Sequence, residues 1–307
     1  MILPSIMPDE WAAGYLGRAA RMNMVRSFSA LQRWIHSVQD AFPVYVESEP
    51  FIHSMAKLIG MTRQVFYAQH TLLPLTHAVQ PIDKCHSHAF ISGKQVAEAH
   101  LFPLMRSSRL CPECVREDLP YWGVSYWRKS HQFYGIVCCV KHGIGLREDY
   151  SVKWHETPQD VLDRSTAVEA AIVSDALSNP VIRRYEEICG VLAMRVRPVS
   201  TNQIVRVICL QYAKVAPYDG DEVADLAAFV NTKVAGPWDE CFFHSAGSAS
   251  ITSTTKRLSS AFHPVDYALV LAALFESSAD AVSSLDNVSL DGTPLGQGDI
   301  PLLPCGR

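Results

Sequence analysis

The sequence predicts a mainly α-helical protein with one small zinc ribbon in its middle. Three observations support this prediction: amphipathic helical patterns over the first 75 residues, a pair of metal-binding spacings near the middle of the chain, and further helical patterns after residue 150. We expect a helical amino-terminal domain over residues 1–85, a zinc-ribbon module over 86–150 and a helical carboxy-terminal domain over 151–276. Residues 277–307 are rich in Ser, Asp, Gly and Pro, and we expect them to form a flexible tail.

Helix-start residues divide the beginning of the amino-terminal domain. Asp9 is a candidate N-cap for a helix over residues 10–24. Ser27 or Ser29 is a candidate N-cap for a second helix over residues 30–39. The chain is therefore expected to begin with two short amphipathic helices.

A candidate helix-turn-helix follows. Helical patterns over residues 52–59 and 62–70 flank Gly60, and the small Ala56 lies four residues before that glycine. Alanine lets a second helix cross closely, and glycine permits a left-handed turn. An ordinary helical hairpin explains the same pattern equally well. The exposed face of the second helix would contain Arg63, Gln64 and Gln69.

Helical patterns recur after residue 150, where the chain becomes acidic. Ser200 or Thr201 is a candidate N-cap for one of these helices. The expected helices cover residues 167–175, 181–194, 203–214, 223–230 and 265–275.

The most informative motif lies in the middle of the chain. Cys111 and Cys114 are followed, after 24 residues, by Cys139 and His142, which gives C-x2-C and C-x2-H. Two such pairs can surround Zn2+ as a tetrahedron, with Zn–S near ~2.3 Å and Zn–N near ~2.0 Å. Because the protein would fill all four positions, the single ion would be structural, and it would stabilise the module by about 10–16 kcal/mol. Cys138 would give the longer C-x3-H, so Cys139 is preferred.

Two neighbouring features have alternative interpretations. A C-H-x-H cluster formed by Cys85, His86 and His88 is a candidate second metal site, although no second pair accompanies it. Aromatic pairs at residues 121–122 and 126–127 alternate with basic residues, as in surfaces that stack on nucleic-acid bases. We prefer the alternative that the same aromatic side chains shield a small zinc core.

Composition and charge indicate the general class of protein, its compartment and the kind of partner it meets. The chain is 48% hydrophobic and 19% charged, as in ordinary globular proteins, and no run approaches the ~18 apolar residues of a membrane helix. Nine cysteines, an odd number, with their clear pairs at zinc spacing, favour a reducing cytoplasm over disulfides. Residues 1–150 carry 15 basic and 12 acidic residues, a net charge of +3, whereas residues 151–307 carry 12 and 19, a net charge of −7. We expect the two halves to face different partners, and +3 is weak for a protein that holds DNA alone.

No catalytic pattern is recognisable. His155 and Glu156 begin an H-E-x-x-H motif, but no histidine stands at position 159. Zinc deaminases need H-x-E before P-C-x-x-C, and Leu110 stands where that proline would be. The chain also lacks a phosphate-binding Walker loop and a G-x-S-x-G motif. We therefore expect a protein that is not an enzyme.

The central block resembles the TniQ family, which includes TnsD and consists of target-selection proteins of transposons. The family pattern runs C-P-x-C, an acidic pair, G-x-x-Y-W-R-x-x-H-Q, a glycine and C-x-x-H-G. Weaker similarities cover the opening P-x-E segment, the H-T-L-x-P-L segment over residues 70–75 and an F-x-H-P element near residue 264. The central pattern is matched by Cys111, Pro112, Cys114, Glu117, Asp118, Gly123, Tyr126, Trp127, Arg128, His131, Gln132, Gly135, Cys139, His142 and Gly143.

The resemblance implies a non-catalytic adaptor. Some relatives have a second C-x2-C ribbon, but residues 144–180 contain no cysteine. The chain is shorter than the TnsD branch, which favours the branch that leaves target choice to an RNA-guided CRISPR complex. The resemblance then implies a homodimer docked on a Cascade-type complex with its guide RNA, which recruits the AAA+ ATPase TnsC and meets target DNA in the assembled complex.

Two alternatives remain open at this point. One is a sequence-specific DNA-binding selector of the TnsD type, and the other is a zinc-stabilised transcriptional regulator. In each case, exposed polar and basic side chains would form the contact with a partner. We expect that contact to involve Arg63, Gln64, Gln69, Arg128 and Lys129.

Overall fold

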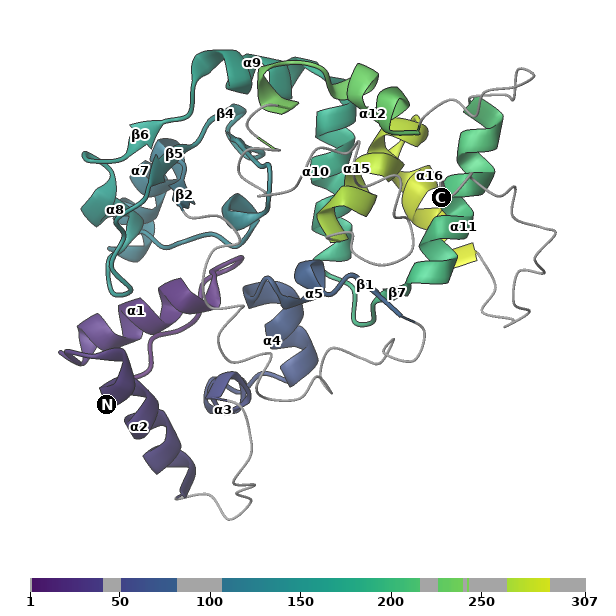
Figure 1. The fold of residues 1–307 in the computed structure, drawn as a ribbon. Helices are drawn as coiled ribbons and strands as arrows, with labels where there is room; N and C mark the ends of the chain where they lie inside the picture. The colour runs from purple at the N-terminus through teal and green to yellow at the C-terminus, as the bar shows by residue number, and fades with distance from the viewer. Residues whose placement is uncertain are drawn as a thin grey trace.

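The computed structural model confirms a mainly α-helical fold, and it describes residues 2–40, 51–81, 107–215, 226–239, 242 and 264–287. Figure 1 shows three regions in this part of the chain. The amino-terminal helices lie below a module of short strands in this view, and the carboxy-terminal helices lie to the right of both.

The amino-terminal region packs its helices around one apolar core. Tyr15, Leu31 and Phe66 are fully buried in it. Ser27 accepts a hydrogen bond from the amide of Ala30 at 3.2 Å, as expected for a cap of the second helix. The helices are α1 (Ala12–Met22), α2 (Phe28–Asp40), α3 (Phe51–Leu58) and α4 (Arg63–His70).

Asp9 does not cap the first helix, so that prediction is wrong. Helix α1 begins at Ala12, its N-cap is Trp11, and no side chain caps it. Asp9 instead has a positive φ of 57°, and its carboxylate accepts hydrogen bonds from the amide and hydroxyl of Ser130. The competing partner lies more than a hundred residues away, which no local pattern indicates.

The predicted helix–turn–helix pair is present as a structural unit. Gly60 lies in the turn with φ 75°, and Thr62 caps α4 by accepting from the amide of Val65 at 3.3 Å. Ala56 and Phe66 are buried, whereas Val65 is 41% exposed. A DNA-binding role for this pair stays a prediction.

The central module contains short strands and one helix that the sequence analysis did not predict. Strands β2 (Ser108–Leu110), β5 (Arg147–Asp149) and β6 (Thr166–Ala167) form an antiparallel sheet with β5 in the middle. Strands β3 (Cys138–Cys139) and β4 (Ile144–Gly145) form a hairpin.

The unexpected helix of the module is α7 (Pro112–Trp122). Proline at its first position and Gly123 with φ 72° at its end are standard boundaries of a helix. The sequence therefore contains the signals for both ends of this helix. A short helix, α8 (Pro158–Val161), lies between β5 and β6 in the chain.

The carboxy-terminal helices surround a helix that is buried on all sides. Every residue of α15 (Pro264–Leu274) is buried, and this helix packs against α10, α11, α12 and the short α5 (Leu73–Thr76). Strand β1 (Val79–Gln80) pairs in parallel with β7 (Val199–Ser200), so the amino-terminal region also joins this domain. The other helices are α9 (Ala170–Ser178), α10 (Pro180–Leu192), α11 (Thr201–Val215), α12 (Leu226–Val234) and α16 (Ser278–Asn287).

Ser200 accepts a hydrogen bond from the amide of Gln203 at 3.2 Å, which identifies it as the cap of α11. Within the described ranges, no single helix is long and apolar enough to cross a membrane. Helices α15 and α16 meet the length and composition only as a pair, and they are bent by 115°.

The prediction of a flexible tail from residue 277 is wrong for residues 278–287. These residues form α16, in which Ala281 and Leu285 are buried. Ser277 accepts from the amide of Asp280 at 3.1 Å and begins the helix. Only two apolar anchors four residues apart hold this face, which is too weak a pattern to distinguish it from a polar tail. Residues 288–307 lie outside the described part of the chain.

Helix α1 approaches the module more closely than side chains would permit. A Cβ on Gly14 would lie 2.9 Å from the Cβ of Trp127. A Cβ on Gly17 would collide with the backbone carbonyl of Trp154. The two glycines therefore allow the module to contact the backbone of α1.

We predict that Gly17→Ala lowers the free energy of unfolding by about 1–3 kcal/mol, because α1 must move away from a backbone atom. The matched control is Gly190→Ala in α10, where nothing lies within 4 Å of the added carbon. That change should stabilise by about 1 kcal/mol through helix propensity alone. Urea unfolding of both variants measures this, and equal effects of the same sign would contradict the packing at Gly17.

Candidate metal centre

The structure brings the four predicted metal ligands together. The ligand atoms of Cys111, Cys114, Cys139 and His142 all lie within 4.8 Å of one another. The three cysteines are buried, and the imidazole is half-buried. The predicted cluster of Cys85, His86 and His88 lies outside the described residues.

The distances between these atoms fit a tetrahedral metal ion. Ligands around such an ion would be separated by about 3.8 Å between sulfurs and about 3.5 Å between sulfur and nitrogen. The Sγ atoms of Cys114 and Cys139 are 3.7 Å apart. The Nδ1 atom of His142 lies 3.4 Å from the Sγ atoms of Cys111 and Cys114 and 3.5 Å from that of Cys139. The residues present therefore fit a tetrahedral ion held by the protein alone.

Two kinds of local structure position these ligands. Cys111 is the N-cap of α7 and Cys114 lies in its first turn, where the helix dipole favours negatively charged thiolates. Cys139 and His142 come from the β3–β4 hairpin, which turns through Gly143 at φ 63°. The centre therefore lies between a helix start and a hairpin.

Glu117 orients the histidine ligand. Its Oε1 lies 3.1 Å from Nε2 of His142, which leaves Nδ1 directed at the sulfurs. Desolvation lowers the pKa of His142, but the hydrogen bonds to Glu117 and Cys139 outweigh it and raise the pKa overall. Glu117 also pairs with Lys141. A carboxylate behind a ligating imidazole fixes its tautomer, and its place one turn after Cys114 is a signal that the sequence contained.

The three thiols cannot all ionise without a cation between them. Hydrogen bonds from Cys111 and Cys114 hold the pKa of Cys139 far below its usual range, and His131 also contributes. The hydrogen bonds to Cys111 and Cys139 and burial raise the pKa of Cys114 correspondingly. Repulsion among three close anions is the arrangement that a bound dication relieves.

Arg128 supports the centre and does not form an exposed contact surface, so the expectation for this residue is wrong. Its guanidinium donates two hydrogen bonds of 2.8 Å to the buried carboxylate of Asp118, and it lies 4.3 Å from the ring centre of Tyr126. Its side chain is only 14% exposed. The burial of Arg128 could be predicted only from the position of Asp118 on α7, which the fold determines.

Lys129 is also buried, at 3% exposure, so the expectation that its side chain is exposed is wrong. Its ammonium donates to the carbonyl of Ala68 in the last turn of α4 and lies 3.8 Å from Sδ of Met194. A cation at a helix C-terminus satisfies a carbonyl that has no partner within the helix. Lys129 therefore joins the module to the amino-terminal helices and contacts the carboxy-terminal domain.

The remaining predicted contact residues lie where they were expected. Arg63, Gln64 and Gln69 are exposed on α4. Their exposure does not by itself show what they bind, and their role stays a prediction.

The histidine and glutamine of the central motif have structural positions. The amide of Gln132 accepts from the backbone of Arg109 at 3.1 Å and donates to its carbonyl at 2.8 Å. This pairing holds β2 against the turn at residues 130–132. His131 is buried beside the thiol of Cys139. The motif residues thus hold the module together.

The aromatic pairs of the module divide into two environments. Tyr126 and Trp127 are buried, so these two rings are not available to stack on bases. Tyr121 and Trp122 are 76% and 41% exposed, with ring centres 4.5 Å apart. The stacking interpretation therefore survives only for the pair at the end of α7.

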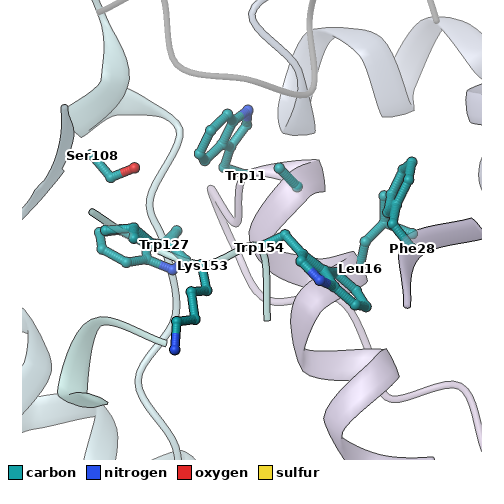
Figure 2. Close-up of a pocket in the computed structure, with 10 residues that line it drawn as sticks. Trp11, Leu16, Phe28, Ser108, Trp127, Lys153 and Trp154 are labelled. Carbon is teal, nitrogen blue, oxygen red and sulfur yellow. The ribbon is translucent and has the colours of Figure 1, made fainter. Parts of the chain in front are cut away.

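Trp127 also bounds an apolar cavity of about 290 Å³ between α1 and the module. Figure 2 shows Trp11, Trp127 and Trp154 around it, with Phe28 beside Trp154 and Lys153 at its edge. The rings of Phe28 and Trp154 meet edge to face at 5.8 Å. The aromatic side chains of both regions thus form the contact that the two glycines of α1 permit.

The amino-terminal segment pairs with the central motif through the backbone. The amide of Trp11 donates to the carbonyl of Trp127 at 2.7 Å, and the amide of Lys129 donates to the carbonyl of Asp9 at 2.8 Å. Glu10 and Arg128 form an isolated antiparallel bridge. The fold and site together define a helical protein in which residues 9–11 pair through the backbone with the module that contains the Cys3His centre.

Residues 1–146 match the family model of TniQ. The first 146 residues therefore contain a TniQ domain, which supports an association with target selection in transposition. A comparison with curated proteins gives no match.

We predict one metal ion per chain in elemental analysis of the purified protein. Cys114→Ser should lose the ion and lower the melting temperature by at least about 10 °C, because folding and metal binding are coupled. Cys138→Ser is the control, since its sulfur faces the carbonyl of Val173 at 3.8 Å and lies outside the cluster. Native protein without metal, or a control variant that loses it, would contradict the assignment.

We also predict a pH-dependent contribution from Lys129. Burial lowers its pKa to about 8, below the unfolded value of 10.5, so the unfolded state binds more protons between these values and stability rises with pH there. At pH 9.5 Lys129→Met should be less stable than native by about 1–3 kcal/mol, because the carbonyl of Ala68 loses its donor. This difference in the free energy of unfolding between native protein and variant should shrink by about 2 kcal/mol toward pH 7.

Unfolding by urea at both pH values measures this gap. The control is Lys57→Met, an exposed change on α3 that should give no pH-dependent difference. A gap for Lys129→Met that stays constant with pH would contradict the buried charge.

Proposed function

We propose that this chain is a non-catalytic target-selection adaptor of a transposon. It would link a CRISPR Cascade-type complex, with its guide RNA, to the AAA+ regulator TnsC, and meet target DNA in the assembled complex. The observation that carries the proposal is the TniQ domain over residues 1–146. This family is one of adaptors without catalytic activity.

The chemistry of the centre supports a structural ion, and we propose that it is Zn2+. Three thiolates and one imidazole in a tetrahedron are the ligand set that Zn2+ prefers. Cys111, Cys114, Cys139 and His142 fill all four positions, so the ion has no open position for water or substrate. When bound, it would supply stability to the module and no reaction step.

The charge distribution supports a protein partner for the second half. Residues 151–307 have a net charge of −7, which repels a DNA backbone. We propose that this half contacts a second copy of the chain or a subunit of the recognition complex. The proposed assembly would work in the cytoplasm, where that complex and its DNA target are found.

One observation favours a second candidate, a DNA-binding selector of the TnsD type. Helix α4 follows a tight turn and exposes Arg63, Gln64 and Gln69, which are side chains that contact phosphates and base edges. In that case the protein alone would bind one duplex strongly and with a steep dependence on salt.

Co-expression with a Cascade-type complex and TnsC distinguishes the two functions. We expect the native chain to co-purify with both and to shift free duplex DNA only weakly at about 150 mM salt. A tight, sequence-dependent shift that is lost in the double variant Arg63→Ala with Gln64→Ala, and kept in Lys214→Ala on α11, would favour the DNA-binding selector. Failure to co-purify with either complex would refute the adaptor.

A further inference from the structure

A cavity of about 440 Å³ lies between the metal-binding hairpin and helix α10. Phe133, Ile136 and Leu177 give it apolar walls. Figure 1 shows α10 between the module and helices α11, α12, α15 and α16. The helix contributes residues spaced by three and four, which therefore share one face: Arg183, Glu186, Glu187 and Gly190.

Glu186 has a carboxylate oxygen without a partner in this cavity. Its Oε1 is buried from solvent and makes no hydrogen bond to any of the residues that the structure describes. The neighbouring Arg183 does not reach it, because the guanidinium donates to the carbonyl of Leu177 at 3.1 Å. Burial raises the pKa of Glu186 to about 7, although Arg183 acts against the shift. A buried carboxylate with an unsatisfied oxygen is unfavourable until a donor, preferably a cation, approaches it.

Gly190 leaves open space on the same face of α10. No described residue lies within 4 Å of the position that its Cβ would occupy, and its φ is not positive. Glycine inside a helix is less stable than alanine, so neither packing nor backbone conformation within the described chain requires it. A glycine at such a position allows the backbone of another molecule to approach closely.

We infer that this cavity is the docking site for an arginine or lysine side chain presented by a partner protein. The aliphatic stem of that residue lies against Phe133 and Ile136, and its charged end reaches Oε1 of Glu186. The backbone that carries it crosses α10 at Gly190. Glu187, exposed at the rim, adds a second carboxylate. The inference deepens the proposed function, because an adaptor needs such a contact, but its test does not depend on the transposition partners.

The test uses the purified full chain and a phage-displayed library of random 12-residue peptides. Bound peptides should share an arginine or lysine. Their affinity should fall by at least about tenfold for Gly190→Leu, which blocks the crossing point, and for Glu186→Gln, which keeps the shape but removes the charge. Replacing the shared arginine by the neutral citrulline should cause a similar loss. The matched control is Ala213→Leu, an exposed position on α11.

Thermal melting establishes that each variant is folded, and Glu186→Gln provides the decisive comparison if Gly190→Leu melts early. The inference is overturned if no peptide is enriched, if the enriched peptides lack a basic residue, or if they bind Glu186→Gln as tightly as native. It is also overturned if Gly190→Leu changes the mass of the particle in light scattering, because the occupant is then a second copy. Peptide binding as expected, together with failure to co-purify with the recognition complex, would refute the proposed adaptor and leave this site in place.

Discussion

The carboxylate of Glu10 is the constraint on which the amino-terminal half depends. It is fully buried, and it accepts hydrogen bonds from the guanidinium of Arg18 and the amide of Met7. The backbone carbonyl of Glu10 is hydrogen-bonded to the imidazole of His70, and the backbone of Glu10 forms a β-bridge with that of Arg128. Removing one partner from a buried ion pair costs about 3–5 kcal/mol. Helix α1, helix α4 and the metal-binding module therefore meet at this one residue, α1 at its carboxylate and the other two at its backbone.

The residues that could be predicted from sequence are those whose chemistry is local. Cys111 and Cys114 carry their own spacing, and Gly60 marks its own turn. Arg128 and Lys129 could not be placed in this way, because a basic residue beside an aromatic one has the same pattern on a surface as in a core. Their burial depends on an acceptor in α7 for one and a helix end in α4 for the other, and both acceptors are fixed only by the complete fold.

The same distinction explains the errors in secondary structure. The mainly helical class, α3 with α4, and the cap at Ser200 followed from periodicity and turn chemistry. Aspartate is a residue type that commonly caps helices, but the carboxylate of Asp9 bonds Ser130, far along the chain. Helix α16 is short and polar, and the burial of Leu285 in the carboxy-terminal core stabilises it. Tertiary contacts decided these elements, and periodicity alone does not contain such contacts.

The match to the family model ends at residue 146, but the fold has no domain boundary there. The hydroxyl of Tyr185 donates to the carbonyl of Tyr134 at 2.7 Å, and the indole of Trp238 donates to the carbonyl of Gly135 at 2.8 Å. A side chain on Gly135 would collide with Phe242, so two later aromatic rings close over the backbone of the module. An exchange of amino-terminal halves between relatives would place this glycine beneath rings that did not evolve with it. The packing of the first half consequently depends on residues of the second.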